Sequence, residues 1–338
     1  MIKRMLPGSD TFKGIQKHTE TCCFQVADIS FFDIILRKRC FLFAYMRKKQ
    51  YFCGLFIVHA YICTEKNGSY MGILSGKRGL IFGALDDRSL AWHVAERCMA
   101  EGASIVLTNT LVGIELGSIG CLAKERGIPL IACDATKLDE ISSLFVRAQE
   151  CLGGKIDFIL HAVAQSMNMR RHKAYTGMNY HYYAQTLDIS AMSLHKLLQV
   201  SMELDALSEG GSVVALSYIG SERYCAGYND MGDAKALLES IACHFGAEYG
   251  MKKGVRVNIV SQSPTMTKAG SEWSDLDYWY RYTDKLSPLG NATADDCANV
   301  CVALFSDLMR SVTMQVIYND GGFGRTILTP ELAEAFRV

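Results

Sequence analysis

The chain has 338 residues, of which 49% are hydrophobic, enough to bury a large core, and its 35 Lys and Arg balance 35 Asp and Glu. A formal charge of +0 gives no electrostatic reason to expect nucleic acid or a membrane surface as a partner, and we expect neither. The 13 cysteines are scattered without CxxC pairs, which predicts reduced thiols in a cytoplasmic protein rather than the disulfides of a secreted one.

Residues 1–70 differ in composition from the rest of the chain. They hold 11 Lys and Arg against 5 Asp and Glu, and their apolar residues follow neither strand nor helix periodicity. The longest uncharged run is too short to span a bilayer, and the order of features in a signal peptide is missing, so we expect no membrane span. Two interpretations stay open: an N-terminal extension, unstructured or produced by a misassigned start, and a membrane-associating leader.

From residue 71 to residue 338, apolar runs suited to buried strands alternate with segments of helical periodicity. Strands are predicted over 79–83, 104–107, 129–132, 157–161, 211–217, 255–260 and 313–317. Helices are predicted over 89–101, 116–126, 138–151, 182–204, 229–249 and 294–308. This alternation predicts an α/β fold, a single domain with a Rossmann-type, doubly wound, seven-stranded parallel sheet and helices on both faces.

The turn after the first predicted strand has features of a phosphate site. Gly83 ends the strand, and Ser89 is placed to cap the next helix, whose N-terminus favours an anion. Any strand-to-helix turn needs a glycine and a cap, so a purely structural interpretation stays open. The second strand ends in Thr108-Asn109-Thr110, without the acid or the Arg that separates NADH from NADPH. Asp134, after the third strand, is interpreted either as an acceptor for an adenine amino group or as a cap.

The segment from Tyr218 to Lys235 holds the strongest candidates for chemistry. Tyr218 follows a predicted buried strand, at the sheet edge where α/β folds bind ligands. Tyr228 and Lys235 are seven residues apart, which on a helix places them two turns apart on one face. Two phenols and an ammonium group near one crevice predict a catalytic site. Cys297 and Cys301, by contrast, are interpreted as buried thiols, because no second His or Cys pair accompanies them, and no metal is expected.

This Tyr-x6-Lys spacing, with a second Tyr ten residues earlier, resembles the enoyl-[acyl-carrier-protein] reductases of bacterial type II fatty acid synthesis. These are a divergent branch of the short-chain dehydrogenase/reductases, whose ordinary members use Ser with Tyr-x3-Lys. Met231 stands here at that Tyr position, and Tyr218 where the Ser is expected. The runs MGILSGKRGLIFGA, VRVNIVSQSPTMTKAG and IYNDGGF extend the resemblance over 71–338, and SPLGNAT is most similar to a Bacteroidetes-type subgroup.

The resemblance implies a function. NADH would reduce the trans-2 double bond of an enoyl-acyl-carrier-protein, the last step of each elongation cycle, in a homotetramer. The catalytic residues would be Tyr218, Tyr228 and Lys235, with Tyr228 bonded to the thioester oxygen and Lys235 holding the nicotinamide ribose and lowering the pKa of Tyr228. The alternatives are a short-chain reductase acting on another enoyl or 3-ketoacyl thioester, and an idle nucleotide-binding scaffold, which predicts the loss of Tyr228 or Lys235.

The same resemblance implies the binding residues. The cofactor would contact Gly83, Ser89, Leu90, Asp134, Ala135, His161, Ala162, Val163, Ala164, Lys235, Pro264, Thr265 and Thr267. The substrate would contact Ala164, Tyr218, Tyr228, Met231 and Ala269. The aromatic segment 268–286 is interpreted as a lid over the acyl chain or as an oligomer contact, and Arg281 and Lys285 as candidates for meeting the carrier protein.

Overall fold

Seven parallel strands form the centre of the fold, in the order β3-β2-β1-β4-β5-β6-β7. This computed structural model describes residues 72–268, 270, 273 and 276–337, so the predicted extension over 1–70 and the predicted substrate residue Ala269 lie outside the described residues. The strands are β1 (Arg78–Phe82), β2 (Ser104–Asn109), β3 (Leu130–Ala132), β4 (Ile156–His161), β5 (Leu207–Ser217), β6 (Arg256–Gln262) and β7 (Val316–Asn319). The predicted sheet and its strand count are confirmed.

The last strand differs from the prediction, which began it at residue 313. Met314 has a φ of 60°, a left-handed conformation that a strand does not accommodate. The Thr313 hydroxyl accepts a hydrogen bond from the Val257 amide at 3.1 Å, so this segment is a turn joined to β6. Strand β7 therefore begins at Val316.

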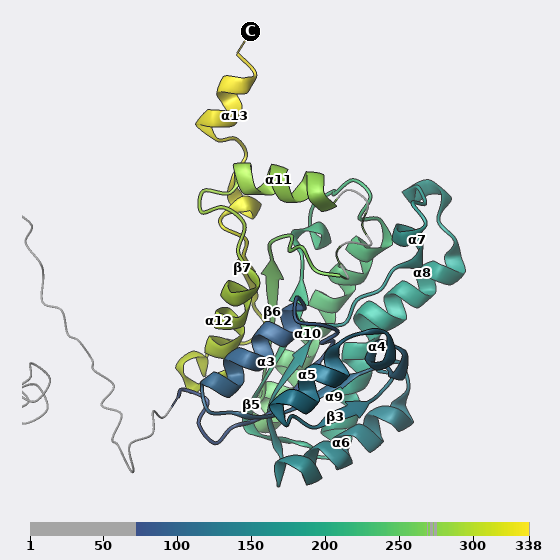
Figure 1. The fold of residues 1–338 in the computed structure, drawn as a ribbon, viewed down its shortest axis with the longest axis vertical. Coiled ribbons are helices and arrows are strands. Elements are labelled where there is room, and N and C mark those ends of the chain that lie inside the picture. The colour runs from purple at the N-terminus through teal and green to yellow at the C-terminus, as the bar shows by residue number, and fades with distance from the viewer. Residues whose placement is uncertain (1–71, 269, 271–272, 274–275, 338) are drawn as a thin grey trace, which may run out of the picture. The chain divides into compact units, whose positions relative to one another are not determined.

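Helices cover both faces of the sheet, because alternate strand residues point to opposite sides. In β1, Leu80 and Phe82 are buried with α6 (Leu138–Leu152), α9 (Ser193–Glu203) and α10 (Asp230–Lys253). Ile81 is buried on the other face. That face is covered by α3 (Leu90–Ala100), α5 (Ile119–Arg126) and α12 (Ala294–Phe305). Figure 1 shows this sheet between its helices.

Several helices depart from the predicted ranges. The long helix predicted over 182–204 is instead α8 (Tyr180–Leu187), a π-helical turn (Asp188–Met192) and α9. Four more were not predicted: α4 (Leu111–Leu116), α7 (Met167–Arg170), α11 (Leu276–Leu286) and α13 (Pro330–Ala335). The shortest of these lack an apolar stripe of useful length, and α4 and α13 bury no residue at all. None of the described helices is long and apolar enough to cross a membrane.

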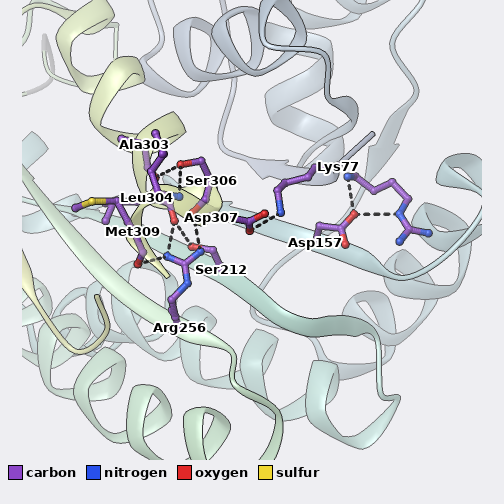
Figure 2. A network of polar contacts seen from close by, with 11 residues as sticks. Lys77, Asp157, Ser212, Arg256, Ala303, Leu304, Ser306, Asp307 and Met309 are labelled. Carbon is purple, nitrogen blue, oxygen red and sulfur yellow. Dashed lines mark hydrogen bonds and ion pairs between the residues drawn. The ribbon is translucent and has the colours of Figure 1, made fainter. Parts of the chain in front are cut away.

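Helices α7, α8 and α11 gather at one end of the domain, towards which the strand arrows point (Figure 1). In a parallel sheet this is the carboxyl end of the strands, where α/β folds bind their ligands. At the opposite end of the sheet, where the strands begin, a buried arginine at the start of β6 joins the sheet to the end of α12 (Figure 2).

The Arg256 guanidinium donates to three backbone carbonyls that end α12 and its continuation. The distances are 2.7 Å to Leu304, 3.1 Å to Met309 and 3.3 Å to Ser306. The Ser212 hydroxyl of β5 donates to the same Leu304 carbonyl at 2.8 Å. These bonds satisfy helix-end carbonyls that are buried away from water, and so they join two strands to the helix.

We expect Arg256→Met to lower the free energy of unfolding by about 3 kcal/mol, because it leaves these carbonyls without donors. Lys77→Met is the matched control, since Lys77 forms an ion pair at 2.9 Å with an Asp307 side chain that is 80% exposed. Exposed pairs contribute only ~0–1 kcal/mol. Urea denaturation of both variants measures the difference, and equal losses would contradict the structural role given to Arg256.

Candidate active site

A cavity of ≈ 350 Å³ lies where β1 to β4 end. Its lining includes residues that follow β1 and β4, the two strands of the switch point where the strand order reverses. Of the predicted cofactor residues, Gly83, Asp134, Ala135 and Val163 line it. Thr108, Asn109 and Thr110, which end the second strand, also line it. The remaining lining residues were not predicted: Phe82, Cys133, Thr136, Gln165, Gln185, Asp188 and Ile189. We call this space the first cavity.

The other predicted cofactor residues lie at the same sheet edge without lining the first cavity. Leu90 is the first residue of α3. Ala162 and Ala164 follow β4, and Pro264, Thr265 and Thr267 follow β6. Gly83 is required by the backbone itself: its φ is 95°, and a Cβ there would lie 2.1 Å from the Ala162 carbonyl oxygen.

Ser89 does not cap α3 with its side chain, contrary to the prediction. Its hydroxyl accepts from the Leu85 and Asp86 amides, both at 3.0 Å, and donates to the Asp86 carboxylate at 3.0 Å. These contacts use its one donor and both of its acceptor sites. The hydroxyl therefore fixes the loop before the helix, while no amide at the α3 N-terminus donates to the Ser89 side chain.

Asn109 and Asp134 shape the wall of the first cavity through local hydrogen bonds. The Asn109 amide group donates to the Ala84 carbonyl at 2.8 Å, which joins the end of β2 to the loop after β1. The Asp134 carboxylate accepts from the Thr136 amide at 3.0 Å and from its hydroxyl at 2.7 Å. These bonds form a local turn rather than a helix cap, because α6 begins at Leu138 with Lys137 at its N-cap position. Asp134 also lines the cavity.

His161, the last residue of β4, is buried and neutral. Burial, with the nearby charge of Lys235, lowers its pKa to about 3. The Ser193 hydroxyl donates to the Ile189 carbonyl at 2.6 Å, so at 2.8 Å it accepts from Nε2–H of His161. His161 therefore carries its proton on Nε2, and Nδ1 is a buried acceptor without a partner among the described residues.

Tyr218 and Tyr228 come together as the sequence predicts. Their rings meet edge to face, with centroids 5.2 Å apart and planes at 71°. Trp273 covers both rings, at 6.5 Å from Tyr218 and 5.5 Å from Tyr228, and stacks on Trp279 of α11 at 5.8 Å. The Tyr218 hydroxyl is buried and has no hydrogen-bond partner in the described part of the chain. Such an orphaned donor at the end of a strand indicates a site built for a ligand.

Tyr228 does not stand on the same helix as Lys235, which corrects the predicted spacing argument. Helix α10 begins at Asp230, and Asn229 before it has φ 45° and ψ −128°, which breaks helical geometry. Tyr228 thus lies in the preceding turn. Burial, with Cys225 and Glu239 nearby, raises its pKa well above the usual range. Lys235, which was expected to lower this pKa, is not among the groups that shift it.

Lys235 is buried in the second turn of α10, and its Nζ donates to the Leu216 carbonyl at 2.8 Å. An ammonium group has three donors, so two remain for other partners. Burial lowers the pKa of Lys235 to about 8, against an opposing effect of Glu239. Met231, the predicted substrate residue, is buried with Met169, Ala234 and Trp273 beside the tyrosines.

A buried carboxylate that the sequence analysis missed fixes the start of α10. Asp230 accepts from the Ser166 hydroxyl at 2.7 Å, the Asn168 amide at 2.9 Å and the Thr186 hydroxyl at 2.9 Å. Its position at the first residue of a helix favours a negative charge. An acidic residue at the start of a predicted helix could have indicated the role of Asp230. Its three partners could not be predicted, because they lie at α7 and α8, which are distant in sequence.

Cys297 and Cys301 are buried on α12 against α3, in the apolar core of that face. Hydrogen bonding to Cys297 and burial both raise the pKa of the Cys301 thiol. Among the described residues, no group of three or more His, Cys, Asp or Glu side chains is arranged to hold a metal ion.

We expect Lys235 to make stability depend on pH in alkaline solution. Between about 8 and the ordinary pKa of 10.5, the unfolded chain keeps a proton that the folded protein releases, so folding is favoured as pH rises through this window. The stability of the wild type relative to Lys235→Met should rise on the order of 2 kcal/mol across it. Urea denaturation at intervals of pH measures this. Lys252→Met, an exposed site on the same helix, should show no such trend, and a flat or falling difference for Lys235→Met would overturn the assignment.

Comparisons with known proteins agree with this geometry. The family model described as enoyl-(acyl carrier protein) reductase matches residues 83–324. An enoyl-[acyl-carrier-protein] reductase [NADH] of Rhizobium meliloti is 35% identical over 270 residues, which cover 79% of this chain and 98% of the relative.

Solved structures match over a similar share of the chain. A FabI–NADH complex from Alistipes finegoldii is 49% identical with a TM-score of 0.77, over 78% of this chain and 94% of that one. An enoyl-(acyl-carrier-protein) reductase from Anaplasma phagocytophilum, solved with NAD, is 29% identical with a TM-score of 0.69, over 77% and 96%. Because the matched residues include Tyr218, Tyr228 and Lys235, together with the glycine turn after β1, the chain belongs to the enoyl-(acyl carrier protein) reductase family.

Proposed function

We propose that this protein reduces the trans-2 double bond of an enoyl-acyl-carrier-protein to the saturated acyl chain, with NADH as the reductant. The observation that carries the proposal is the pair Tyr218 and Tyr228, where the buried Tyr218 hydroxyl lacks a partner among the described residues. The buried cation Lys235 donates to the carbonyl of Leu216, two residues before Tyr218. The family of the chain and the relatives named for NADH support the choice of reaction and cofactor.

The residues present fit a dinucleotide. The first cavity lies at the switch point of the sheet and is lined by small and polar groups from four strand ends. The α3 N-terminus faces this edge, with the Ser89 hydroxyl engaged elsewhere, and its amides suit a pyrophosphate. Two N–H donors of Lys235 are left for ribose hydroxyls. When bound, NADH supplies the hydride that the β-carbon of the enoyl group receives.

The protein groups then stabilise the charge that develops on the thioester oxygen. The raised pKa of Tyr228 keeps its phenol protonated, so it donates a hydrogen bond to that oxygen as an enolate forms. Lys235, when protonated, adds a positive charge at the end of β5, and the Tyr218 hydroxyl, which has no partner among the described residues, is available for the same region. Trp273 packs against both rings, and the low-dielectric surroundings of the buried Tyr218 strengthen these interactions.

The alternative of an ordinary short-chain reductase receives no support from these residues. That reaction needs a hydroxyl at the position of Met231, which is apolar and buried here. It also needs a Ser where Tyr218 stands.

We expect Tyr228→Phe and Lys235→Ala each to lower kcat/KM roughly 100-fold, which is the usual loss when a donor to a developing oxyanion is removed. The measurement is oxidation of NADH, and in parallel of NADPH, driven by a crotonyl thioester. Tyr224→Phe is the matched control, because Tyr224 lies in the same loop and is 90% exposed. Full activity in both active-site variants would reject the catalytic assignment.

We also propose that residues 71–338 form the complete catalytic domain. The family match over 83–324 lies inside it and supports this boundary. A protein lacking residues 1–70 should keep the kcat and KM of the full chain and remain in the soluble fraction. Activity that falls, or membrane association that disappears, on deletion would instead favour the leader interpretation.

A cytoplasmic homotetramer is part of the same proposal. All eight described cysteines are free thiols, which suits a reducing compartment. The C-terminal segment exposes Ile327 (92%) and Phe336 (78%), and exposed apolar side chains of this size favour contact with another copy.

A further inference from the structure

The segment from Gln165 to Leu187 carries a net positive charge, whereas the chain as a whole is neutral. It contains Arg170, Arg171, His172 and Lys173 in succession, and neither Asp nor Glu, in a protein whose formal net charge is +0. All four basic residues are exposed. Exposed Tyr175 and Tyr180, at 55% and 85%, lie on the same segment. We call residues 170–173 the basic loop.

The basic loop borders a second cavity of ≈ 310 Å³. That cavity is lined by Gln165, Met167, Tyr182, Gln185, Thr186 and Ile189. Three of these residues also line the first cavity, so the two spaces share a wall. The Arg171 guanidinium lies 4.9 Å from the centre of the Tyr182 ring. Positive charge thus stands at the outer wall of the space next to the candidate active site.

The backbone of the basic loop is fixed to the catalytic turn. The amides of His172 and Lys173 donate at 3.0 Å to the carbonyls of Met169 and Asn168. The Asn229 side chain, next to Tyr228, donates to the Lys173 carbonyl at 2.6 Å. The Asn168 side chain in turn bonds to Asp230. The charges are therefore presented from a preorganised backbone, which lowers the entropy cost of binding.

Helix α11 carries Arg281 and Lys285, the other candidates for meeting the carrier protein. This helix should attract a negatively charged partner more weakly than the basic loop does. Arg281 forms an ion pair with Asp277 at 2.7 Å, and Asp284 directly precedes Lys285 in the sequence. The two positive charges of α11 are thus balanced by two negative ones. Within the described ranges, by contrast, neither Arg171 nor Lys173 forms an ion pair.

We propose that Arg171 and Lys173 are the docking surface for the acyl carrier protein, binding the phosphodiester that begins its pantetheine arm and the carboxylates beside it. The arm would then enter the second cavity, which shares a wall with the first cavity. This inference rests on the proposed function and names the surface that recognises its protein-bound substrate. Arginine and lysine are the residues that bind phosphate and carboxylate most strongly.

The test compares two substrates in steady-state kinetics: an enoyl chain on acyl carrier protein, and the same chain on N-acetylcysteamine, which has no phosphate and no protein. For Arg171→Ala/Lys173→Ala we expect KM for the carrier-bound substrate to rise on the order of tenfold and to lose most of its salt dependence. The kcat and KM for the small thioester should stay unchanged. Arg281→Ala/Lys285→Ala, the matched control on α11, should leave both substrates within about twofold.

Each other outcome contradicts the inference. Equal losses with both substrates mean that the loop supports the pocket instead of docking a partner. An effect confined to the α11 variant places docking there. A change of oligomeric mass in the basic-loop variant, measured by light scattering, assigns the surface to contact between copies. Failure of the wild type to oxidise NADH with either substrate rejects the proposed function itself, separately from the docking surface.

Discussion

The buried carboxylate of Asp230 is the contact on which the site depends most. It accepts hydrogen bonds from two elements that are distant from it in sequence, through Ser166 and Asn168 at α7 and Thr186 of α8. Bonds to a charged group contribute about 1.5–3 kcal/mol each when their partners are buried. The helix that carries Lys235 begins at this residue, and the turn that carries Tyr228 precedes it directly. One anion at a helix start thus fixes the position of both catalytic groups.

Desolvation gives the site its electrostatic character. The same burial raises the pKa values of Tyr218 and Tyr228, lowers that of Lys235 to about 8 and lowers that of His161 to about 3. The phenols and the imidazole are therefore neutral near neutral pH, and Lys235 is the cation among them. A low-dielectric site of this kind makes each hydrogen bond to a developing oxyanion stronger than it would be in water.

Much of the fold was readable because a buried parallel strand has a strong signal. The run around Leu80 and Phe82 is apolar on both faces, and runs of this type recur between helical segments. Weaker sequence patterns gave wrong predictions where contacts between distant segments determine the local structure. The helix predicted over 182–204 is interrupted by a π-helical turn, where Ser190 bonds to Gln165 across the site. Ser89 is a residue typical of helix caps, but its hydroxyl accepts hydrogen bonds from amides of the preceding loop instead.

The parallel sheet and the family resemblance could be predicted from the amino-acid sequence, and so could the candidates Tyr218, Tyr228 and Lys235, because strand periodicity and short motifs are local properties. Only the tertiary structure decided that Tyr228 lies in a turn rather than on α10, that Asp230 anchors that turn, and that the basic loop stands beside the second cavity. These features arise from contacts between segments tens of residues apart. Such contacts are set by three-dimensional packing, which no single stretch of sequence contains.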